Sequence, residues 1–300
     1  QASRATARML QDRRIPVAQQ GRWGVWASQV VWGMSKDLGN TAAYDVSGWG
    51  AAAGAETPVG DAGVIGGSFG YLLGKNVNGG NDNEVDTNQF ELAGYWRGDM
   101  GPLQAYARVS GAFIRFEGQR RFTGTNGTQP VTRTAEANWN GSLFSGAAGA
   151  SYEIQKGRLS LRPTAAIEYY RLSEGDYSET GGGDAFNLDV DKRKGDELAA
   201  TGSVVVGYDF GSMDPQGTWL RVEAEAGRRE IVAGDLGATT ARFAGGNDFV
   251  LQAEERQSGW VGRLRLAGGT PIFRLGGEFS AEEQQGKAAF AFRIGLNAAF

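Results

Sequence analysis

Carboxylates are the side chains of this sequence that could do acid and base chemistry. Glu223 and Glu225 are two residues apart, so in an extended strand both project from one face. The chain of 300 residues contains no His and no Cys. Imidazole is therefore missing as base, proton shuttle or metal ligand, and no disulfide or thiolate metal site can form. A ladder of charges along one strand face is the commoner reason for such a pair, and we predict no catalytic residue, no metal and no cofactor.

The composition indicates a mostly β protein. The chain has 48 Gly and only 7 Pro, and its Trp, Tyr and Phe residues are spread along its length, which suits strands that bend and pack closely. A net charge of −4 argues against a nucleic-acid partner. No apolar run is long enough for a transmembrane helix, so a membrane could be crossed only by a closed barrel. No signal segment follows Gln1, and we expect a piece of a longer protein.

Alternating apolar and polar residues divide the chain into about twelve segments, each long enough to cross a bilayer as a tilted strand. The predicted strands are residues 23–33, 44–56, 62–74, 87–98, 103–117, 138–154, 158–171, 196–210, 218–232, 255–266, 271–281 and 288–300. Short connections such as QKGR alternate with long polar ones, for example residues 75–86 and 173–195. Short turns at one end and long loops at the other are typical of outer-membrane barrels.

Charged residues decide between a membrane barrel and a soluble β-sandwich. In a sandwich the charged faces would be the solvated outer surface, whereas in a barrel they line the lumen, because Arg facing lipid costs roughly 2 to 4 kcal/mol at the midplane. The loop pattern and the strand lengths favour a twelve-stranded antiparallel transmembrane barrel. The residues predicted to line the lumen are Glu91, Arg97, Arg108, Arg162, Glu168, Arg221, Glu223, Glu225, Arg263, Arg265, Arg274, Glu278 and Arg293.

Aromatic and small residues refine this prediction. Trp32, Trp49, Trp96, Tyr208, Phe210 and Phe300 fall near strand ends, and we expect them on the apolar outer face at the level of lipid headgroups. Inward small residues either leave space along one wall of the lumen or simply let strands curve and pack closely. These residues are Gly48, Gly50, Ala52, Gly66 and Gly70.

The first twenty residues do not follow the strand pattern. Ser3 can cap a helix that continues through good helix formers until Pro16 makes further helix costly. The segment carries Arg4, Arg8, Arg13 and Arg14 against a single acidic residue, Asp12. It could be a solvated linker helix, or a helix that plugs the lumen of a twelve-stranded barrel with its arginines against inward carboxylates.

The last strand carries a terminal pattern of polar, Gly, apolar and aromatic residues at Arg293, Gly295, Ala298 and Phe300. This pattern resembles the signal by which the outer-membrane assembly machinery recognises barrels, although Ala298 is smaller than usual. With the helical lead-in and the twelve strands, the whole chain resembles the C-terminal translocator β-barrel of autotransporters, the type V secretion family of Gram-negative bacteria.

The resemblance implies a function in the outer membrane. Residues 1–20 would be the linker or plug helix and residues 21–300 the translocator barrel, which supports export of a covalently linked N-terminal passenger. Its partners would be outer-membrane lipid and the barrel assembly machinery, and we expect a monomer. Some family members cut themselves at an Asn-Asn pair, but this sequence has none, so that activity is not carried over.

Two other functions stay open. A porin or solute channel is the main alternative, although porins commonly have more strands and an inward loop in place of a leading helix. An outer-membrane enzyme is the second, but the barrel proteases, phospholipases and deacylases rely on His.

Overall fold

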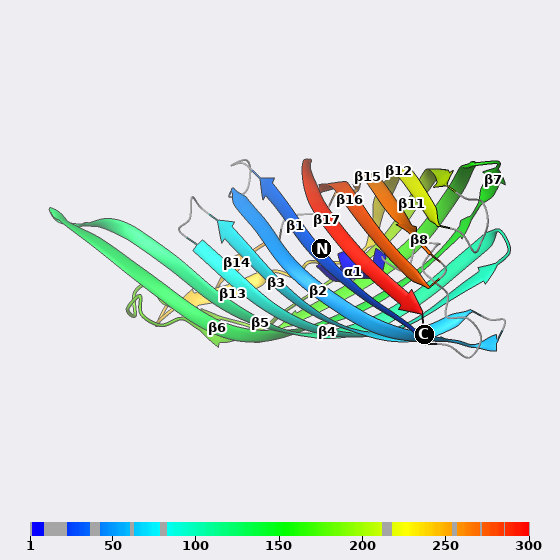
Figure 1. Cartoon of the computed structure of the whole chain (residues 1–300). Helices are drawn as coiled ribbons and strands as arrows, with labels where there is room; N and C mark the ends of the chain where they lie inside the picture. Colours follow the sequence, from blue (N-terminus) through cyan, green and yellow to red (C-terminus); the bar gives the residue numbers. More distant parts are fainter. Residues whose placement is uncertain are drawn as a thin grey trace.

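The chain folds into a closed antiparallel β-barrel with a short helix inside it (Figure 1). The computed structural model describes residues 2–8, 23–36, 43–60, 63–78, 83–211, 218–253, 257–270, 272–284 and 286–299. Within these ranges twelve strands form the barrel, and the ring closes where the last strand, β17 (Lys287–Ala299), pairs with the first, β1 (Gly24–Lys36). The predicted all-β fold and the twelve-stranded barrel are confirmed.

Most barrel strands pair with their neighbours in the sequence. They are β2 (Tyr44–Pro58), β3 (Val64–Asn78), β4 (Asn83–Met100), β5 (Leu103–Asn126), β6 (Gln129–Tyr152), β8 (Leu159–Glu174), β11 (Arg193–Gly211), β12 (Trp219–Ala233), β15 (Gly259–Gly269) and β16 (Phe273–Gln284). The short strand β7 (Ile154–Lys156) extends one hairpin, and α1 (Ala2–Ala7) is the helix. No helix in the described part of the chain is long and apolar enough to cross a membrane.

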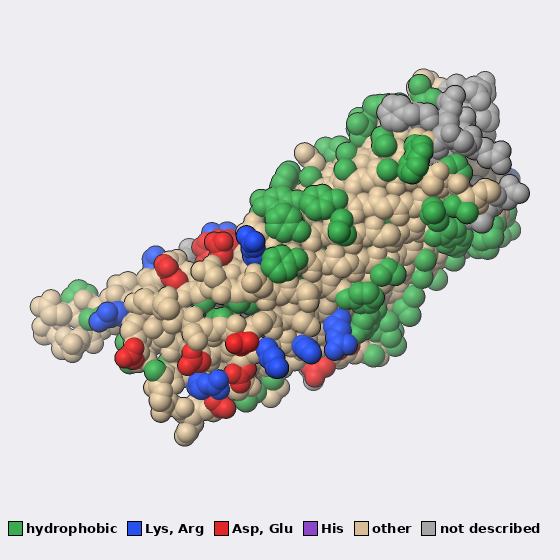
Figure 2. All heavy atoms as spheres, turned by 90° about the horizontal axis from the view of Figure 1, so that it is seen from below, with side chains coloured by type: hydrophobic (Ala, Val, Ile, Leu, Met, Phe, Trp, Pro, Cys, Tyr) green, Lys and Arg blue, Asp and Glu red, His purple; other side chains and the backbone are tan. Residues whose placement is uncertain are grey.

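Apolar side chains cover the outside of the barrel and charged ones fill its inside. Val222 and Phe279 are 40% and 44% exposed, whereas Arg221 and Arg274, on the opposite faces of the same strands, are 4% and 1% exposed. Figure 2 shows the apolar side chains around the body of the barrel and most charged ones at one end. This arrangement excludes the soluble sandwich, whose charged faces would be outermost.

The two ends of the barrel differ. We call the end with tight connections the short-turn end. In its turn between β4 and β5, Gly101 has a φ of 65°, a conformation that favours glycine. At the other end, the long-loop end, β5 and β6 continue as a hairpin of 24 residues per strand that projects well beyond the rest of the barrel (Figure 1).

The prediction is therefore wrong for two of the long loops, because most of their residues extend the neighbouring strands. Residues 75–78 belong to β3 and residues 83–86 to β4, while residues 118–137 form most of the projecting part of β5 and β6. Alternating apolar residues mark a strand only where one face is buried in an apolar environment. The projecting segments are polar on both faces and are held by backbone pairing, so the sequence pattern did not reveal them.

The remaining long segments form a second sheet at the long-loop end, which we call the outer sheet. Its four strands run in the order β14 (Phe249–Leu251), β13 (Thr239–Phe243), β10 (Leu188–Val190) and β9 (Tyr177–Ser178). Its β9 side is fixed to the projecting hairpin, because Thr180 pairs with Glu136 and the ring of Tyr177 stacks on Trp139 at 4.3 Å. Burial, and then the nearby carboxylates Glu179 and Glu174, raise the pKa of the Tyr177 phenol.

Trp32 corrects the prediction for the aromatic residues. Its side chain is buried inside the barrel, not at the outer surface, because Gly48 directly opposite on β2 leaves room for it. A Cβ atom at Gly48 would come within 2.1 Å of the Trp32 ring. Gly66 accommodates Tyr95 in the same way, at 2.3 Å. Aromatic rings thus cover these glycines, which therefore do not widen the lumen.

Candidate functional site in the barrel lumen

The lumen has two different walls. Strands β1 to β5 contribute buried apolar and aromatic side chains, among them Trp26, Val30, Trp32, Leu72, Tyr95 and Tyr106. Strands β8, β11, β12, β15, β16 and β17 contribute most of the buried charges. We call these the apolar wall and the charged wall. Helix α1 lies against β1 and β2, and its two described arginines extend to the charged wall.

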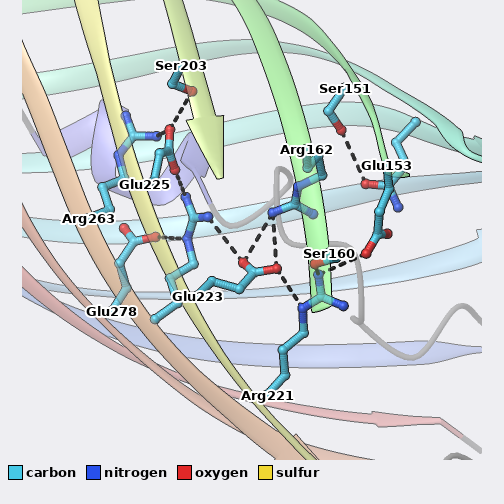
Figure 3. Close-up of polar contacts among 12 residues, drawn as sticks. Ser151, Glu153, Ser160, Arg162, Ser203, Arg221, Glu223, Glu225, Arg263 and Glu278 are labelled. Atoms are coloured by element: carbon cyan, nitrogen blue, oxygen red, sulfur yellow. Dashed lines mark hydrogen bonds and ion pairs between the residues drawn. The ribbon is translucent and has the colours of Figure 1, made fainter. Parts of the chain in front are cut away.

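Arg221 on β12 joins three buried carboxylates, two of which, Glu153 and Glu223, are labelled in Figure 3. Its guanidinium lies 2.8 Å from Glu153, 2.8 Å from Glu223 and 3.3 Å from Asp209. Arg162 on β8 donates a second contact to Glu223, at 3.1 Å. All five side chains are buried, so this cluster ties β8, β11 and β12 together by charge-assisted hydrogen bonds.

A second group surrounds Glu225. Arg263 approaches this carboxylate at 2.8 Å and Arg265 at 2.6 Å, while Ser203 donates its hydroxyl at 2.7 Å. Arg265 also contacts Glu278 at 2.6 Å, and thus connects β12, β15 and β16. Glu223 and Glu225 are each paired with at least two arginines and join neighbouring strands of the charged wall, which agrees with their interpretation as a charge ladder.

Smaller ion pairs lie on the opposite side of the lumen. Arg108 on β5 pairs with Glu91 on β4 and donates to the Ser110 hydroxyl at 3.1 Å. Arg97 pairs with Glu56, which also accepts a hydrogen bond of 3.1 Å from the Tyr95 hydroxyl. Each of these inward charges of the first five strands is thus paired with an opposite charge.

Helix α1 is fixed to the charged wall at three strands. The Arg4 guanidinium lies 3.6 Å from Glu168 on β8, 3.4 Å from Glu197 on β11 and 2.9 Å from Glu282 on β16. Arg8 pairs with Glu282 and donates to the Ser280 hydroxyl at 3.1 Å. On the other side, Gln89 of β4 donates to the Ser3 hydroxyl at 2.8 Å. The helix therefore bridges the lumen from wall to wall.

The same contacts give the direction of α1. Strand β16 runs from the short-turn end to the long-loop end, so Glu282 lies nearer the long-loop end than Ser280 does. Arg4 contacts Glu282, whereas Arg8, one turn later, reaches down to Ser280. The N-terminus of α1 therefore points towards the long-loop end.

Every residue predicted to line the lumen is buried on the inner side of the barrel strands. The structure brings most of them into the clusters described above, while Arg274 instead lies over the Trp219 ring at 5.5 Å. Sequence reasoning missed Glu56, Glu153, Glu197, Asp209 and Glu282. Glu282 could have been found by continuing the alternation along β16.

Other predicted residues lie partly beyond what the structure describes. Arg13, Arg14 and Phe300 are outside the described residues. Within β17, Arg293 is buried and lies 3.5 Å from Glu278, whereas Ala298 is half-buried. The side chains that the structure describes contain no group of three or more metal-ligating residues close enough to hold an ion.

A closed barrel that is apolar outside, charged inside and crossed by a helix defines the class of outer-membrane β-barrels with an occupied lumen. Residues 25–271 match the autotransporter beta-domain family, and the chain belongs to that family. It is an outer-membrane translocator domain from a Gram-negative bacterium and supports export of a linked N-terminal passenger across the outer membrane. No curated protein matches the chain by sequence.

Solved structures show the same fold at low sequence identity. The translocator domain of the autotransporter NalP from Neisseria meningitidis is 15% identical, with a TM-score of 0.74 over 99% of this chain and 96% of that one. The beta domain of the Bordetella autotransporter Brka is 14% identical, with a TM-score of 0.61 over 92% and 98%. The transport unit of AIDA-I from Escherichia coli is 12% identical, with a TM-score of 0.53 over 99% and 98%.

Proposed function

We propose that residues 1–20 act as a plug that closes the translocator barrel of residues 21–300 after the passenger has passed through the lumen. The contacts of Arg4 and Arg8 with Glu168, Glu197 and Glu282 carry this proposal. Three strands of the charged wall hold one helix, and breaking a buried ion pair typically costs about 3 to 5 kcal/mol. The helix would therefore stay in place once it has entered.

The charged wall has two functions in this proposal. Inward charges of both signs keep the path wet while an extended polypeptide or a hairpin moves through it. Once transport has ended, the same carboxylates bind the two arginines of α1. Arg13 and Arg14 would add to the positive charge of the plug.

The domain performs no chemistry on a substrate in this proposal. Glu223 and Glu225 are held between arginines at 2.6 to 3.1 Å, an arrangement that opposes proton transfer. The chain also contains no His and no Cys. The imidazole and thiol groups that most often serve in acid–base or nucleophilic catalysis are therefore missing.

The partners follow from the outer surface and the last strand. Side chains such as Phe290 and Phe292 on β17 are 49% and 44% exposed and would contact lipid acyl chains. Arg293, Gly295, Ala298 and Phe300 would present the terminal signal to the barrel assembly machinery. A closed ring leaves no free strand edge among the described barrel strands, which supports a monomer.

Single-channel conductance of the refolded domain tests the plug. We expect the chain of residues 1–300 to conduct poorly and the chain of residues 21–300 to conduct several-fold more, because the helix occupies the lumen. Equal and high conductance of both proteins would instead indicate a solute channel. Equal and low conductance would mean that other residues close the lumen and that α1 is not the plug.

A further inference from the structure

Three carboxylates from three strands surround the guanidinium group of Arg4. Its Nη1 lies 2.9 Å from Glu282, its Nη2 lies 3.4 Å from Glu197, and its Nε lies 3.6 Å from Glu168. Each nitrogen therefore faces a different carboxylate, and the carboxylates come from β16, β11 and β8. This arrangement fits a planar cation that carries its donors in fixed, different directions.

An aromatic ring completes the surroundings of Arg4. The guanidinium carbon lies over the Tyr170 ring, 5.8 Å from its centre, which is within the range of a cation–π contact. Tyr170 follows Glu168 by two residues on β8, so both side chains project from the same face of that strand. We call the four residues around the guanidinium group the Arg4 site: Glu168, Tyr170, Glu197 and Glu282.

Burial makes the shape of the bound cation matter. The Arg4 side chain and the three carboxylates around it are each at least nine-tenths buried. Water has little access there, so a cation that leaves one of these carboxylates unpaired loses an interaction that water does not replace. The Arg4 site therefore favours a cation that reaches all three.

Lysine does not meet this requirement at position 4. Its ammonium group is a compact point charge, and one nitrogen cannot take the three positions that Nε, Nη1 and Nη2 of Arg4 occupy. Arg8 provides the contrast within the same helix. In the described part of the chain it pairs with one carboxylate, Glu282, and donates to the Ser280 hydroxyl at 3.1 Å. A single ammonium group could make both of those contacts.

The barrel strands hold the Arg4 site together from the other side. Arg229 on β12 pairs with Glu197 and lies 3.6 Å from Glu168. Arg263 on β15 lies 3.7 Å from Glu282. Because both arginines belong to the barrel, the carboxylates have partners in the barrel itself. The barrel thus builds the site, and α1 supplies its ligand.

We propose that the Arg4 site is a receptor for a guanidinium group, which accepts arginine but not lysine from the plug and binds a small guanidinium ion when Arg4 is removed. This inference rests on the proposed function, because it gives the chemical class of the group by which the plug is held. Positive charge on the helix is then not enough to close the lumen.

Chemical rescue of the chain of residues 1–300 tests the proposal. Arg4→Ala removes the part of the side chain that ethylguanidinium reproduces, and the variant should be open several-fold longer than the unchanged chain in single-channel recordings. Ethylguanidinium at millimolar concentration should restore closure. Propylammonium, the corresponding fragment of lysine, should fail to do so at the same ionic strength. Equal rescue by both cations, or rescue by neither, would overturn the proposal.

A double variant shows where the ethylguanidinium acts. Arg4→Ala combined with Glu197→Gln lacks one carboxylate of the Arg4 site, so ethylguanidinium should restore closure several-fold less well than in Arg4→Ala alone. Equal rescue in the two variants would show that the cation blocks the pore elsewhere, and the Arg4 site would not be the receptor.

Two conservative variants give a measurement without an added ligand. Arg4→Lys keeps the charge of the helix and should open the lumen nearly as often as Arg4→Ala does. Arg8→Lys makes the same change one turn later and should open it several-fold less often than Arg4→Lys, because Arg8 contacts a single carboxylate. Migration on a heat-modifiable gel confirms that both variants are folded. Equal open times in the two would contradict the proposal.

The outcomes separate this inference from the proposed function. If the chain of residues 1–300 is closed and Arg4→Lys is closed as well, the plug stands and only the selectivity for guanidinium is refuted. If the chain of residues 1–300 conducts as well as that of residues 21–300, the plug itself is refuted. The urea midpoint then still decides, because ethylguanidinium should raise that of Arg4→Ala and propylammonium should not.

Discussion

Arg4 donates a hydrogen bond of 2.9 Å to Glu282, although 278 residues separate them in the sequence. The contact joins the helix at the start of the chain to β16, the last strand but one. The plug can therefore be fixed only after the barrel has nearly closed. Glu282 also pairs with Arg8, so one carboxylate holds both described arginines of α1.

Glu282→Gln should loosen the plug. The substitution removes the negative charge that Arg4 and Arg8 share, and leaving such groups without a counter-charge costs about 3 to 5 kcal/mol when they are buried. We expect frequent openings in single-channel recordings of the chain of residues 1–300. Glu283→Gln, on the exposed face of the same strand, is the control and should stay closed. Identical recordings of the two variants would show that Glu282 does not hold the helix.

Arg221→Ala should destabilise the barrel itself. The loss of this guanidinium leaves Glu153, Asp209 and Glu223 close together and with less compensating charge, so we expect a loss of about 3 to 5 kcal/mol in the free energy of unfolding. Urea unfolding in lipid vesicles, followed by Trp fluorescence, measures the change. Arg228→Ala removes an exposed arginine that pairs with Glu230, and should have little effect. A similar midpoint for both variants would contradict the role given to Arg221.

Gly66→Ala should displace the Tyr95 ring. The new Cβ atom would come within 2.3 Å of that ring, and overpacking of this kind costs about 1 to 3 kcal/mol. The same urea titration measures the loss, and a double variant with Tyr95→Ala should lose less than the sum of the two single variants. Gly94→Ala, where a Cβ meets nothing within 4 Å, is the control. Additive losses would show that the glycine does not serve the ring.

Single Cys variants should separate the two faces of the strands. A spin label at Val222→Cys or Phe279→Cys should respond strongly to oxygen dissolved in the bilayer, because both side chains face outward from the barrel. A label at Ser203→Cys, which replaces a buried lumen residue, should not. Equal responses at all three positions would reject the assignment of the faces.

The two-residue period of a strand explains how much could be predicted from the sequence. On β12, charged residues at Arg221, Glu223 and Glu225 alternate with apolar ones, so the inward face was clear without a structure. On β1 both faces are largely apolar, since Val25 and Val31 point outward while Val30 and Trp32 point inward. Alternation carries no information in such a strand, and for that reason Trp32 was placed on the wrong side.

The sequence by itself determined the barrel, its twelve strands and the side of each charged strand that meets the lumen, because these depend on local periodicity and composition. Only the tertiary structure decided which charges meet. Arg4 finds Glu168, Glu197 and Glu282 because the closed ring brings β8, β11 and β16 around one point of the lumen. Such contacts depend on strand register and on the curvature of the whole barrel, and no local stretch of sequence specifies either.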